Sequence, residues 1–252
     1  MTDALQARGL KKAFSGVKAA DDVSVTIKSG EIVSLIGANG AGKTTFVNMV
    51  TGYLKPDSGT ILAQGRDITG LKPREITRLG VCRSFQIPQV FNDLTLEENL
   101  SVAVNVAIRG GAWRHSALRS AANAKARQMT DEILARFKLD PFRHNRANEV
   151  SGGTRKLLDV GMATISHPRV LLLDEPTSGV ASNEKFAFMD VVMQALSDDD
   201  VAVLFIEHDM DIVRRYARRV IVFHEGRILA DGVPDDALNQ EDVKLYVTGE
   251  PV

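Results

Sequence analysis

A glycine-rich run occurs at residues 37–45, where the chain reads Gly37-Ala38-Asn39-Gly40-Ala41-Gly42-Lys43-Thr44-Thr45. It matches the pattern of a glycine, four residues, a second glycine, a lysine, and a serine or threonine, which is typical of a phosphate-binding loop. Glycines allow successive backbone N–H groups to turn inward and approach phosphate oxygens closely. Lys43 would supply a positive charge to the β- and γ-phosphates, and the Thr44 hydroxyl would suit Mg²⁺. The run therefore predicts a site for a nucleoside triphosphate and its metal ion.

The segments on either side of this loop fit the same interpretation. Residues 31–37 have an apolar centre and predict a strand that enters the loop, and residues 43–53 predict a helix that leaves it. The first turn of a helix adds unpaired N–H groups and a favourable dipole for negative charge. A glycine-rich turn without a ligand would require neither flank, so this alternative is disfavoured.

Short apolar runs alternate with longer amphipathic segments along most of the chain. The runs that predict strands cover residues 23–27, 31–37, 60–63, 80–85, 170–173, 201–206, 220–223 and 227–230. Helices are predicted over residues 43–53, near 155–166, over 186–196 and near 210–217, and the last two strand runs predict a hairpin around residues 224–226. Strands that alternate with helices are typical of an α/β fold with a mostly parallel sheet. Residues 95–139 differ, because Met129, Ile133 and Phe137 repeat every four residues, which indicates an inserted helical subdomain.

The composition is that of an ordinary globular protein. Of 252 residues, 44% are hydrophobic and 25% are charged, which is ample apolar material for a core. The net charge of −1 gives no support to nucleic-acid binding. The single cysteine, Cys82, rules out an intramolecular disulfide and fits a reducing compartment.

We find no pattern that predicts a signal peptide or a membrane-spanning helix. The N-terminal residues lack a basic region followed by an apolar core. The most apolar runs, residues 170–173 and 201–206, are far shorter than the roughly 20 residues that a spanning helix needs. If the protein works at a membrane, we expect another chain to anchor it.

A second chemical signal is the apolar run at residues 170–173, which ends in Asp174 and Glu175. Proteins usually hold Mg²⁺ with one or two carboxylates together with substrate oxygens, so Asp174 is a candidate for orienting the metal ion. Glu175 is a candidate general base that polarises the attacking water. Together with the glycine-rich loop, the acidic strand end predicts a nucleoside triphosphatase or a kinase.

Three further features occur in a fixed order along the chain. Gln86 follows a predicted strand and precedes the helical insert, Val150-Ser151-Gly152-Gly153-Thr154 opens a predicted helix, and His208 follows the strand after the acidic one. The helix start at Ser151 is a second N-terminus suited to phosphate. A lone glutamine or histidine usually has a structural role. A functional interpretation therefore rests on the order and spacing of these three features together with the glycine-rich loop and the acidic strand end.

With these motifs in this order, the chain resembles the ATP-binding-cassette (ABC) ATPases over nearly its whole length. The resemblance implies that Phe14 stacks on adenine, that Gln86 is the Q-loop residue sensing Mg²⁺ and a membrane partner, and that His208 contacts the γ-phosphate. It also implies that Ser151-Gly152-Gly153 is the signature motif and that residues 178–181 form the D-loop. The residues expected to bind the nucleotide are Phe14, Gly37, Asn39, Gly40, Ala41, Gly42, Lys43, Thr44, Thr45, Ser151, Gly152 and Gly153. Thr44, Gln86 and Asp174 are expected at the metal ion, and Glu175, His208 and Gln86 in catalysis.

A finer match is to the branched-chain amino-acid importers, in which the chain is most like the larger of two ATPase subunits. It rests on residues 83–86, Phe91, and residues 94–100, 156–160 and 206–210. Two positions depart from the family pattern. Thr154 stands where the signature usually has glutamine, and Ala181 stands where the D-loop usually has aspartate or asparagine. Both belong to the expected dimer interface, so they bear on how well this subunit serves its partner's nucleotide.

The resemblance implies a P-loop NTPase (RecA-like) fold, with a mostly parallel sheet, an N-terminal antiparallel β-subdomain and an inserted α-helical subdomain. We expect one ABC ATPase domain over residues 1–252, with residues 1–86 and 152–252 as catalytic core and residues 87–151 as the approximate helical insert. The implied function is an MgATP-hydrolysing subunit that energises a membrane importer of branched-chain or other hydrophobic amino acids.

The expected partners are membrane permease subunits and a second ATPase subunit, a paralogue rather than a second copy, and no nucleic acid. The expected location is the periphery of the membrane, at the cytoplasmic face of the plasma (inner) membrane. A soluble ABC ATPase acting in assembly or translation stays open as an alternative, although the chain has one cassette and no sustained heptads. A non-enzymatic nucleotide sensor is suggested only by Thr154 and Ala181, and the intact Glu175 and His208 argue against it.

Overall fold

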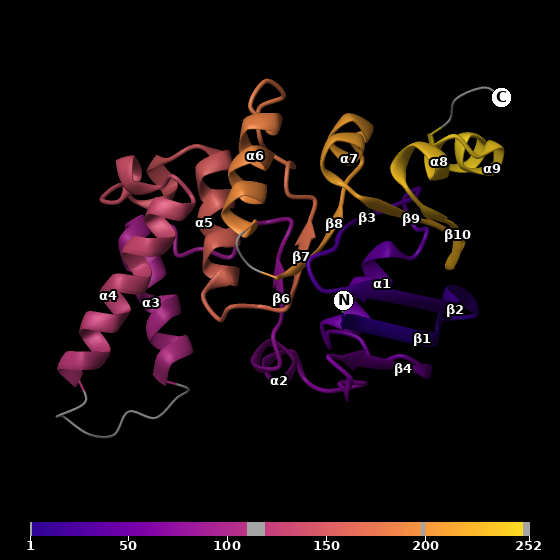
Figure 1. The fold of residues 1–252 in the computed structure, drawn as a ribbon, viewed down its shortest axis with the longest axis horizontal. Coiled ribbons are helices and arrows are strands. Elements are labelled where there is room, and N and C mark those ends of the chain that lie inside the picture. Colours follow the sequence, from indigo (N-terminus) through magenta and orange to yellow (C-terminus); the bar gives the residue numbers. More distant parts are fainter. Residues whose placement is uncertain (1, 110–118, 198–199, 249–252) are drawn as a thin grey trace. The chain divides into compact units, whose positions relative to one another are not determined.

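The structure, a computed structural model, describes residues 2–109, 119–197 and 200–248 (Figure 1). This part of the chain divides into two compact units. The first comprises Met1–Arg83, Pro168–Pro176 and Asp199–Val252, and the second comprises Ser84–His167 and Thr177–Asp198, as far as these ranges are described. The described strands belong to the first unit, apart from the last residue of one of them, and the second unit is built of helices.

One sheet of the first unit is antiparallel, with the strand order β2-β1-β4-β5. Its strands are β1 (Asp3–Phe14), β2 (Val17–Lys28), β4 (Ser58–Ala63) and β5 (Arg66–Asp67). Val23, Val25 and Ile27 of β2 are buried, because alternate side chains of a strand point to the same face. The predicted N-terminal antiparallel subdomain is therefore confirmed.

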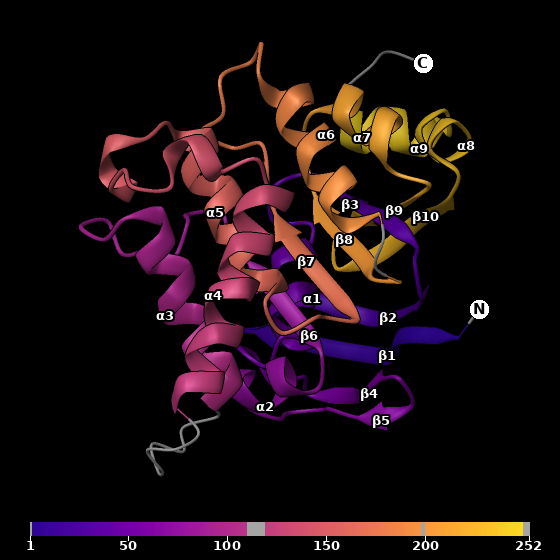
Figure 2. The ribbon, with the colours of Figure 1, turned by 60° about the vertical axis from the view of Figure 1, so that its left-hand side comes forward.

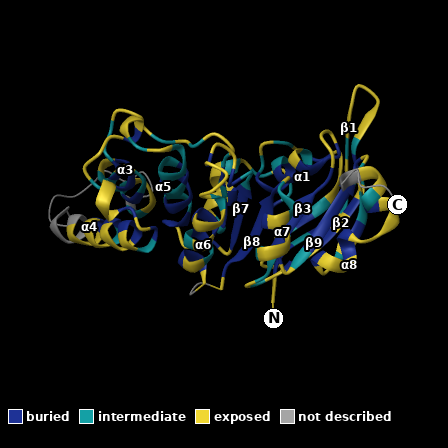
Figure 3. Ribbon diagram, turned by 90° about the horizontal axis from the view of Figure 1, so that it is seen from above, coloured by how far each residue is buried: buried dark blue, intermediate teal, exposed yellow. Residues whose placement is uncertain are grey.

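The other sheet has the strand order β10-β9-β3-β8-β7-β6. Its strands are β3 (Ile32–Ile36), β6 (Val81–Ser84), β7 (Val170–Asp174), β8 (Ala202–Ile206), β9 (Arg219–His224) and β10 (Arg227–Gly232). β3 runs parallel to β8 and β9, β7 runs parallel to β8, and β10 returns antiparallel to β9. β7 and β8 are buried almost throughout, as Figure 3 shows in dark blue. Burial on both faces explains why these strands read as continuous apolar runs in the sequence.

The carboxyl ends of β3, β7 and β8 lie at the same edge of this sheet, because the three strands are parallel. β3 leads into the glycine-rich loop and then into α1 (Lys43–Val50), and β7 ends at Asp174. β8 is followed directly by the segment that carries His208. Ligands of open α/β sheets bind at the carboxyl ends of the strands, so the fold places three predicted motifs where a ligand is expected.

The first unit also contains short helices and a π-helical turn. These elements are α2 (Pro73–Arg78), α7 (Met210–Tyr216), α8 (Pro234–Leu238), α9 (Glu241–Val243) and the turn η4 (Lys244–Thr248). The ring of Tyr246 in η4 stacks on His224 at the end of β9, with the ring centroids 4.7 Å apart. This contact ties the described end of the chain to the parallel sheet.

In its described residues, the second unit has four α-helices and two short 3₁₀ helices. They are α3 (Leu96–Arg109), α4 (Arg119–Arg136), η2 (Asp140–Phe142), η3 (Ala147–Glu149), α5 (Gly152–Thr164) and α6 (Lys185–Leu196). α3 packs beside α4, as Figure 2 shows. A Cβ atom on Gly161 of α5 would lie 3.0 Å from Cγ2 of Ile133, so α5 packs closely on α4. The helical character predicted for residues 95–139 is confirmed where these residues are described.

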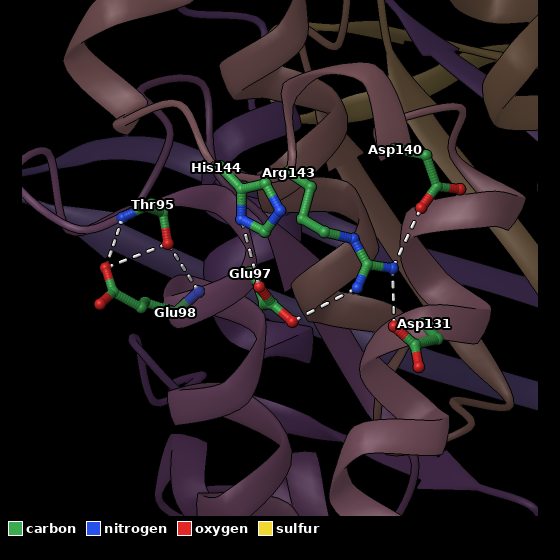
Figure 4. Close-up of polar contacts among 7 residues, drawn as sticks. All are labelled: Thr95, Glu97, Glu98, Asp131, Asp140, Arg143 and His144. Atoms are coloured by element: carbon green, nitrogen blue, oxygen red, sulfur yellow. Dashed lines mark hydrogen bonds and ion pairs between the residues drawn. The ribbon is translucent and has the colours of Figure 1, made fainter.

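The connection between α4 and α5 is held by a polar network (Figure 4). Nη2 of Arg143 lies 2.6 Å from Oδ1 of Asp131 in α4, and Nη1 lies 3.4 Å from Oε1 of Glu97 in α3. At the start of α3, Thr95 and Glu98 form a reciprocal cap, because each side chain accepts a hydrogen bond from the other's backbone N–H. These contacts fix the ends of the helices within the second unit.

None of the helices among the described residues combines the length and the apolar character needed to cross a bilayer.

Candidate nucleotide site

The glycine-rich loop packs so closely on its surroundings that two of its glycines admit no side chain. Gly37 has φ 148°, and a Cβ atom there would lie 2.3 Å from the carbonyl oxygen of Phe223. Gly42 has φ 107°, and a Cβ atom there would lie 2.5 Å from the carbonyl oxygen of Ala19. Both the backbone conformation and the lack of space therefore require glycine at these positions.

Within the rest of the loop, Ala41 is bound to a neighbouring turn and other residues are exposed. The carbonyl of Ala41 accepts a hydrogen bond from the N–H of Gly226, at 2.9 Å, and Ala41 is buried. Asn39, Gly40 and Thr44 are exposed, and Thr45 is half-buried. The first turn of α1 carries no acidic residue, so its N–H groups and dipole remain suited to an anion.

Lys43 is buried although its side chain carries a charge. It is 6% exposed, and its Nζ donates hydrogen bonds to the carbonyl oxygens of Gly37 at 2.7 Å and Ala38 at 3.0 Å. Burial lowers the pKa of the Lys43 ammonium, and the negative charges of Glu175 and Asp174 act in the opposite direction. The ammonium thus lies inside the loop and within electrostatic reach of both carboxylates.

Asp174, at the end of β7, forms a largely buried ion pair. Its Oδ2 lies 2.5 Å from Nη2 of Arg83 in β6. The other terminal nitrogen of Arg83 donates to Oδ1 of Asn48 in α1, at 2.7 Å. Arg83 therefore connects the acidic strand with the helix that follows the glycine-rich loop.

Glu175 has a backbone conformation that is unusual for a residue with a side chain. Its φ is 46°, in the left-handed region, and its N–H donates to the carbonyl of Ile206 at 3.1 Å. Such conformations cost about 1–3 kcal/mol and gather at functional sites. Oε1 of Glu175 lies 3.3 Å from Nε2 of His208. The structure thus brings Lys43, Asp174, Glu175 and His208 together.

Phe14 lies at the end of β1, in the hairpin that β1 forms with β2. Its ring is half exposed, and Nζ of Lys12 lies 5.7 Å from the ring centroid. An exposed aromatic face of this kind is compatible with base stacking, and its adenine-binding role stays a prediction.

The signature residues belong to the second unit. Ser151 is the N-cap of α5, and its Oγ accepts a hydrogen bond from the N–H of Thr154 at 3.1 Å. A Cβ atom on Gly152 would lie 2.7 Å from the carbonyl oxygen of Gly179, so the signature packs directly against the D-loop. Ser151 is exposed, as is Ala181 of the D-loop, while Gly152 and Gly153 are half-buried.

Gln86 also belongs to the second unit, and its side chain is exposed. The roles of Gln86 and of the signature residues towards a nucleotide stay predictions.

A model of the ABC transporter family matches residues 20–178. The chain belongs to the ABC transporter family. The prediction that the chain is an ABC ATPase with a P-loop NTPase fold is therefore confirmed.

Relatives of this ABC ATPase cover nearly its whole length. LivG of Salmonella typhimurium, a high-affinity branched-chain amino acid transport ATP-binding protein, is 34% identical over 250 residues, which is 98% of each chain. LivG of Archaeoglobus fulgidus, a probable branched-chain amino acid transport ATP-binding protein, is 35% identical and covers 95% of this chain and 93% of its own length. The crystal structure of the ADP conformation of MJ1267, an ATP-binding cassette of an ABC transporter, has a TM-score of 0.82 and 32% identity, covering 96% of this chain and 97% of that one.

Arg83 of the ABC ATPase has a contact that was not predicted from the sequence. It forms an ion pair with Asp174, whereas the sequence indicated only that residues 83–86 match the branched-chain amino-acid importers. A signal was present, because a charged residue within the strand run Val81-Cys82-Arg83-Ser84 requires a partner if it is buried. The sequence could not show which carboxylate that partner is.

The residues of the ABC ATPase that would hold a divalent cation fit Mg²⁺ by their chemistry. Thr44 offers a hydroxyl oxygen and Asp174 a carboxylate, which are the hard oxygen donors that Mg²⁺ prefers. Among the described residues, no three His, Cys, Asp or Glu side chains gather into a cluster that could hold a metal by themselves.

We predict that Lys43→Ala weakens MgATP binding about 10- to 150-fold and abolishes turnover, because it removes a charge-assisted contact worth about 1.5–3 kcal/mol. Titration calorimetry and a phosphate-release assay would measure both effects. Lys55→Ala, at an exposed lysine of the same unit, is the control and should leave both values unchanged. Normal hydrolysis by Lys43→Ala would contradict the assignment of the loop.

Proposed function

We propose that this ABC ATPase binds and hydrolyses MgATP and thereby energises a membrane importer of branched-chain or other hydrophobic amino acids. The observation that carries the proposal is the cluster at the sheet edge. A buried lysine lies inside the glycine-rich loop near two carboxylates, and a histidine contacts one of them. The solute class is supported by the relatives, whose names specify branched-chain amino acid transport.

Within this proposal the residues have different tasks. Lys43 and the backbone N–H groups of residues 37–45 bind the phosphates, and Phe14 stacks on the adenine. Thr44, Asp174 and Gln86 hold Mg²⁺, which would neutralise charge on the phosphate oxygens. Glu175 takes a proton from the attacking water, because a positioned carboxylate acts as a general base. His208 keeps the Glu175 carboxylate in place and contacts the γ-phosphate.

A complete site requires a second ATPase subunit, which we propose to be a paralogue. The N-terminus of α5, at Ser151, would close over the ATP that the partner's loop holds, since a helix N-terminus favours phosphate. Closure and opening would then follow binding and hydrolysis by a shift in population. Thr154 and Ala181, one half-buried and one exposed, would lie in this interface and set how tightly it closes.

The permease is proposed to dock on the start of the helical insert, directly after Gln86, where apolar side chains are exposed; we assign the insert to about residues 87–151. Ile87 is 74% exposed and Phe91 is 53% exposed, directly after Gln86. The buried Asn99 holds the backbone of Phe91, because its Oδ1 accepts from the Phe91 N–H at 2.7 Å and its Nδ2 donates to the Phe91 carbonyl at 3.0 Å. The backbone of Phe91 is therefore held in place. Exposed apolar side chains that lie near one another, such as Ile87 and Phe91, can mark an interaction site. Docking there would place the subunit at the cytoplasmic face of the membrane.

We expect Phe91→Glu to uncouple transport from hydrolysis while basal ATP hydrolysis stays largely intact. A charge at an exposed apolar contact disfavours the permease interface but touches none of the residues around Lys43. Solute uptake into proteoliposomes, measured together with phosphate release, gives the ratio of the two rates. Phe142→Glu is the matched control, since Phe142 is also exposed and belongs to the same unit. An unchanged ratio in Phe91→Glu would remove this surface from the proposal.

The function as a whole is tested in a deletion strain and by purification from the native membrane. We expect lower uptake of leucine, isoleucine and valine in the deletion strain, and a permease that copurifies with the chain. Normal uptake with a permease still bound would reject only the solute. Normal uptake together with recovery of the chain without any permease would favour the soluble ABC ATPase instead.

A further inference from the structure

The segment that carries Gln86 leaves the sheet and has no regular structure of its own. After β6 ends at Ser84, residues 85–90 form neither helix nor strand. Backbone N–H and C=O groups that leave a sheet need new partners, or their burial costs free energy. Two charged side chains of α5 supply several of the partners that this segment needs.

Lys156 is the first of them, and it is 1% exposed. Its Nζ donates to the carbonyl oxygen of Phe85 at 2.8 Å and to that of Gln86 at 2.7 Å. One ammonium group thus holds two successive carbonyls and fixes the backbone on both sides of the Gln86 Cα atom.

Asp159 is the second, one turn further along α5, and it is 5% exposed. Its Oδ2 accepts from the hydroxyl of Ser84 at 2.5 Å, and its Oδ1 accepts from the N–H of Gln89 at 2.8 Å. Burial raises the pKa of the Asp159 carboxyl, and the hydrogen bonds from Ser84, Gln89 and Phe85 and the charge of Lys156 act against this rise. The Asp159 carboxylate therefore holds the segment on both sides of Gln86.

The two side chains share one face of α5, because residues three apart in a helix are neighbours. Burying a lysine and an aspartate costs desolvation free energy, and an apolar pair of similar volume is often as stable. A gain in stability alone is thus a weak explanation for the presence of this buried pair. The contacts of the pair have a different effect, because they hold the backbone of Gln86 in place and leave its side chain exposed.

We infer that Lys156 and Asp159 are positioning residues that fix the Q-loop segment, residues 85–90, to α5. Gln86 and the signature motif at the start of α5 then move as one body. The inference rests on the role that the proposed function gives to Gln86. Lys156 lies five residues after the Ser151 N-cap on the same helix. A partner nucleotide that attracts the N-terminus of α5 would therefore also shift Gln86, through two side chains that are buried within the second unit.

The test uses the full chain assembled with its partner ATPase and permease. Lys156→Met keeps the length of the side chain and removes its donors. We expect a kcat that falls about 10- to 100-fold, the loss typical of a misplaced reactive group, and a Kd for MgATP at this subunit that changes by a much smaller factor, because Lys43 and the loop still bind the phosphates. Lys156→Arg should recover part of the kcat, because a guanidinium can still donate to the two carbonyls.

Leu158→Ala is the matched control for a merely structural effect, since Leu158 is fully buried on the same helix. It should lower the melting temperature and leave kcat unchanged. If Lys156→Met behaves like Leu158→Ala, with lost stability and normal kcat, the positioning inference is wrong. Should Lys156→Met fail to fold, Asp159→Asn serves instead, and hydrogen exchange at the Phe85 and Gln89 amides should rise about tenfold or more, as expected for loss of a charged acceptor.

A double-mutant cycle separates this inference from the proposed function. If Lys156 acts through Gln86, the combination of Lys156→Met with Gln86→Ala should be no slower than Gln86→Ala alone. Additive losses would overturn the inference. A normal kcat and normal coupling in Gln86→Ala itself would instead count against the proposed role of the Q-loop.

Discussion

Glu175→Gln is expected to turn over ATP about 10²–10⁴-fold more slowly than the unaltered subunit while it still binds ATP, because a positioned base contributes a factor of this size. The substitution keeps the size of the side chain and removes its ability to take a proton from water. The backbone N–H of residue 175 can still donate to Ile206, and the contact with His208 can persist as a hydrogen bond. With the correct partner present, ATP should then hold the two ATPase subunits together.

Phosphate release measures the turnover, and size-exclusion chromatography with ATP measures the trapped dimer. Glu225→Gln is a closely matched control. Glu225 also has a left-handed backbone, with φ 45°, and also lies beside a histidine, but it is 86% exposed and belongs to the β9–β10 turn. Glu225→Gln should hydrolyse ATP at the normal rate. Equal rates in the two variants would show that Glu175 is not the base.

Arg83→Met is expected to lower the free energy of unfolding by about 3–5 kcal/mol, because breaking a buried ion pair leaves a charge in the interior. Arg83 lies 2.5 Å from Asp174, and both side chains are largely buried. The substitution also removes the hydrogen bond to Asn48, so the link between the acidic strand and α1 is lost. We further expect weaker binding of MgATP, since Asp174 is no longer oriented.

Chemical denaturation, with circular dichroism as the probe, measures the loss. Arg227→Met is the control, because Arg227 and Asp21 also lie 2.5 Å apart but Arg227 is exposed. Exposed ion pairs contribute little, so this variant should be far less affected. Similar losses in the two variants would mean that burial of the Arg83 pair has no special role.

The sequence predicted the nucleotide loop and the acidic strand end because both are encoded locally. The glycines at 37 and 42 are required by the backbone of the loop itself, and Asp174 simply ends an apolar strand. Parallel pairing of β3, β7 and β8 then brought Lys43, Glu175 and His208 together. Parallel pairing could be expected from the alternation of strands and helices alone.

Strand β1 was not predicted, and the structure gives the reason. The pairing of β1 with β2 shifts in register between Ala7 and Leu10, and Gly9 between them has φ 58°. Leu5, Ala7 and Leu10 are all buried, but this irregularity breaks the alternation that would have marked a strand. The sequence pattern therefore predicted part of β2, the second strand of the hairpin, but not β1, the first.

The partners of Arg83, Lys156 and Asp159 were equally beyond the sequence. Each of these side chains bonds to a group more than thirty residues away, namely Asn48 and Asp174 for Arg83, and the Q-loop segment for the other two. No spacing rule connects such positions. A buried charge can be suspected from an apolar context, but its partner depends on how the elements pack.

The glycine-rich loop is joined to the turn between β9 and β10 through Gly226, whose N–H donates to Ala41 and whose carbonyl accepts from Asp21 of β2. One glycine thus connects the parallel sheet, the antiparallel sheet and the residues that would grip the phosphates. A ligand that binds only the folded loop raises the free energy of unfolding of every part of the protein that unfolds together with the loop. Nucleotide should therefore raise the melting temperature of both sheets by the same amount, and a calorimeter should record their unfolding as a single cooperative transition.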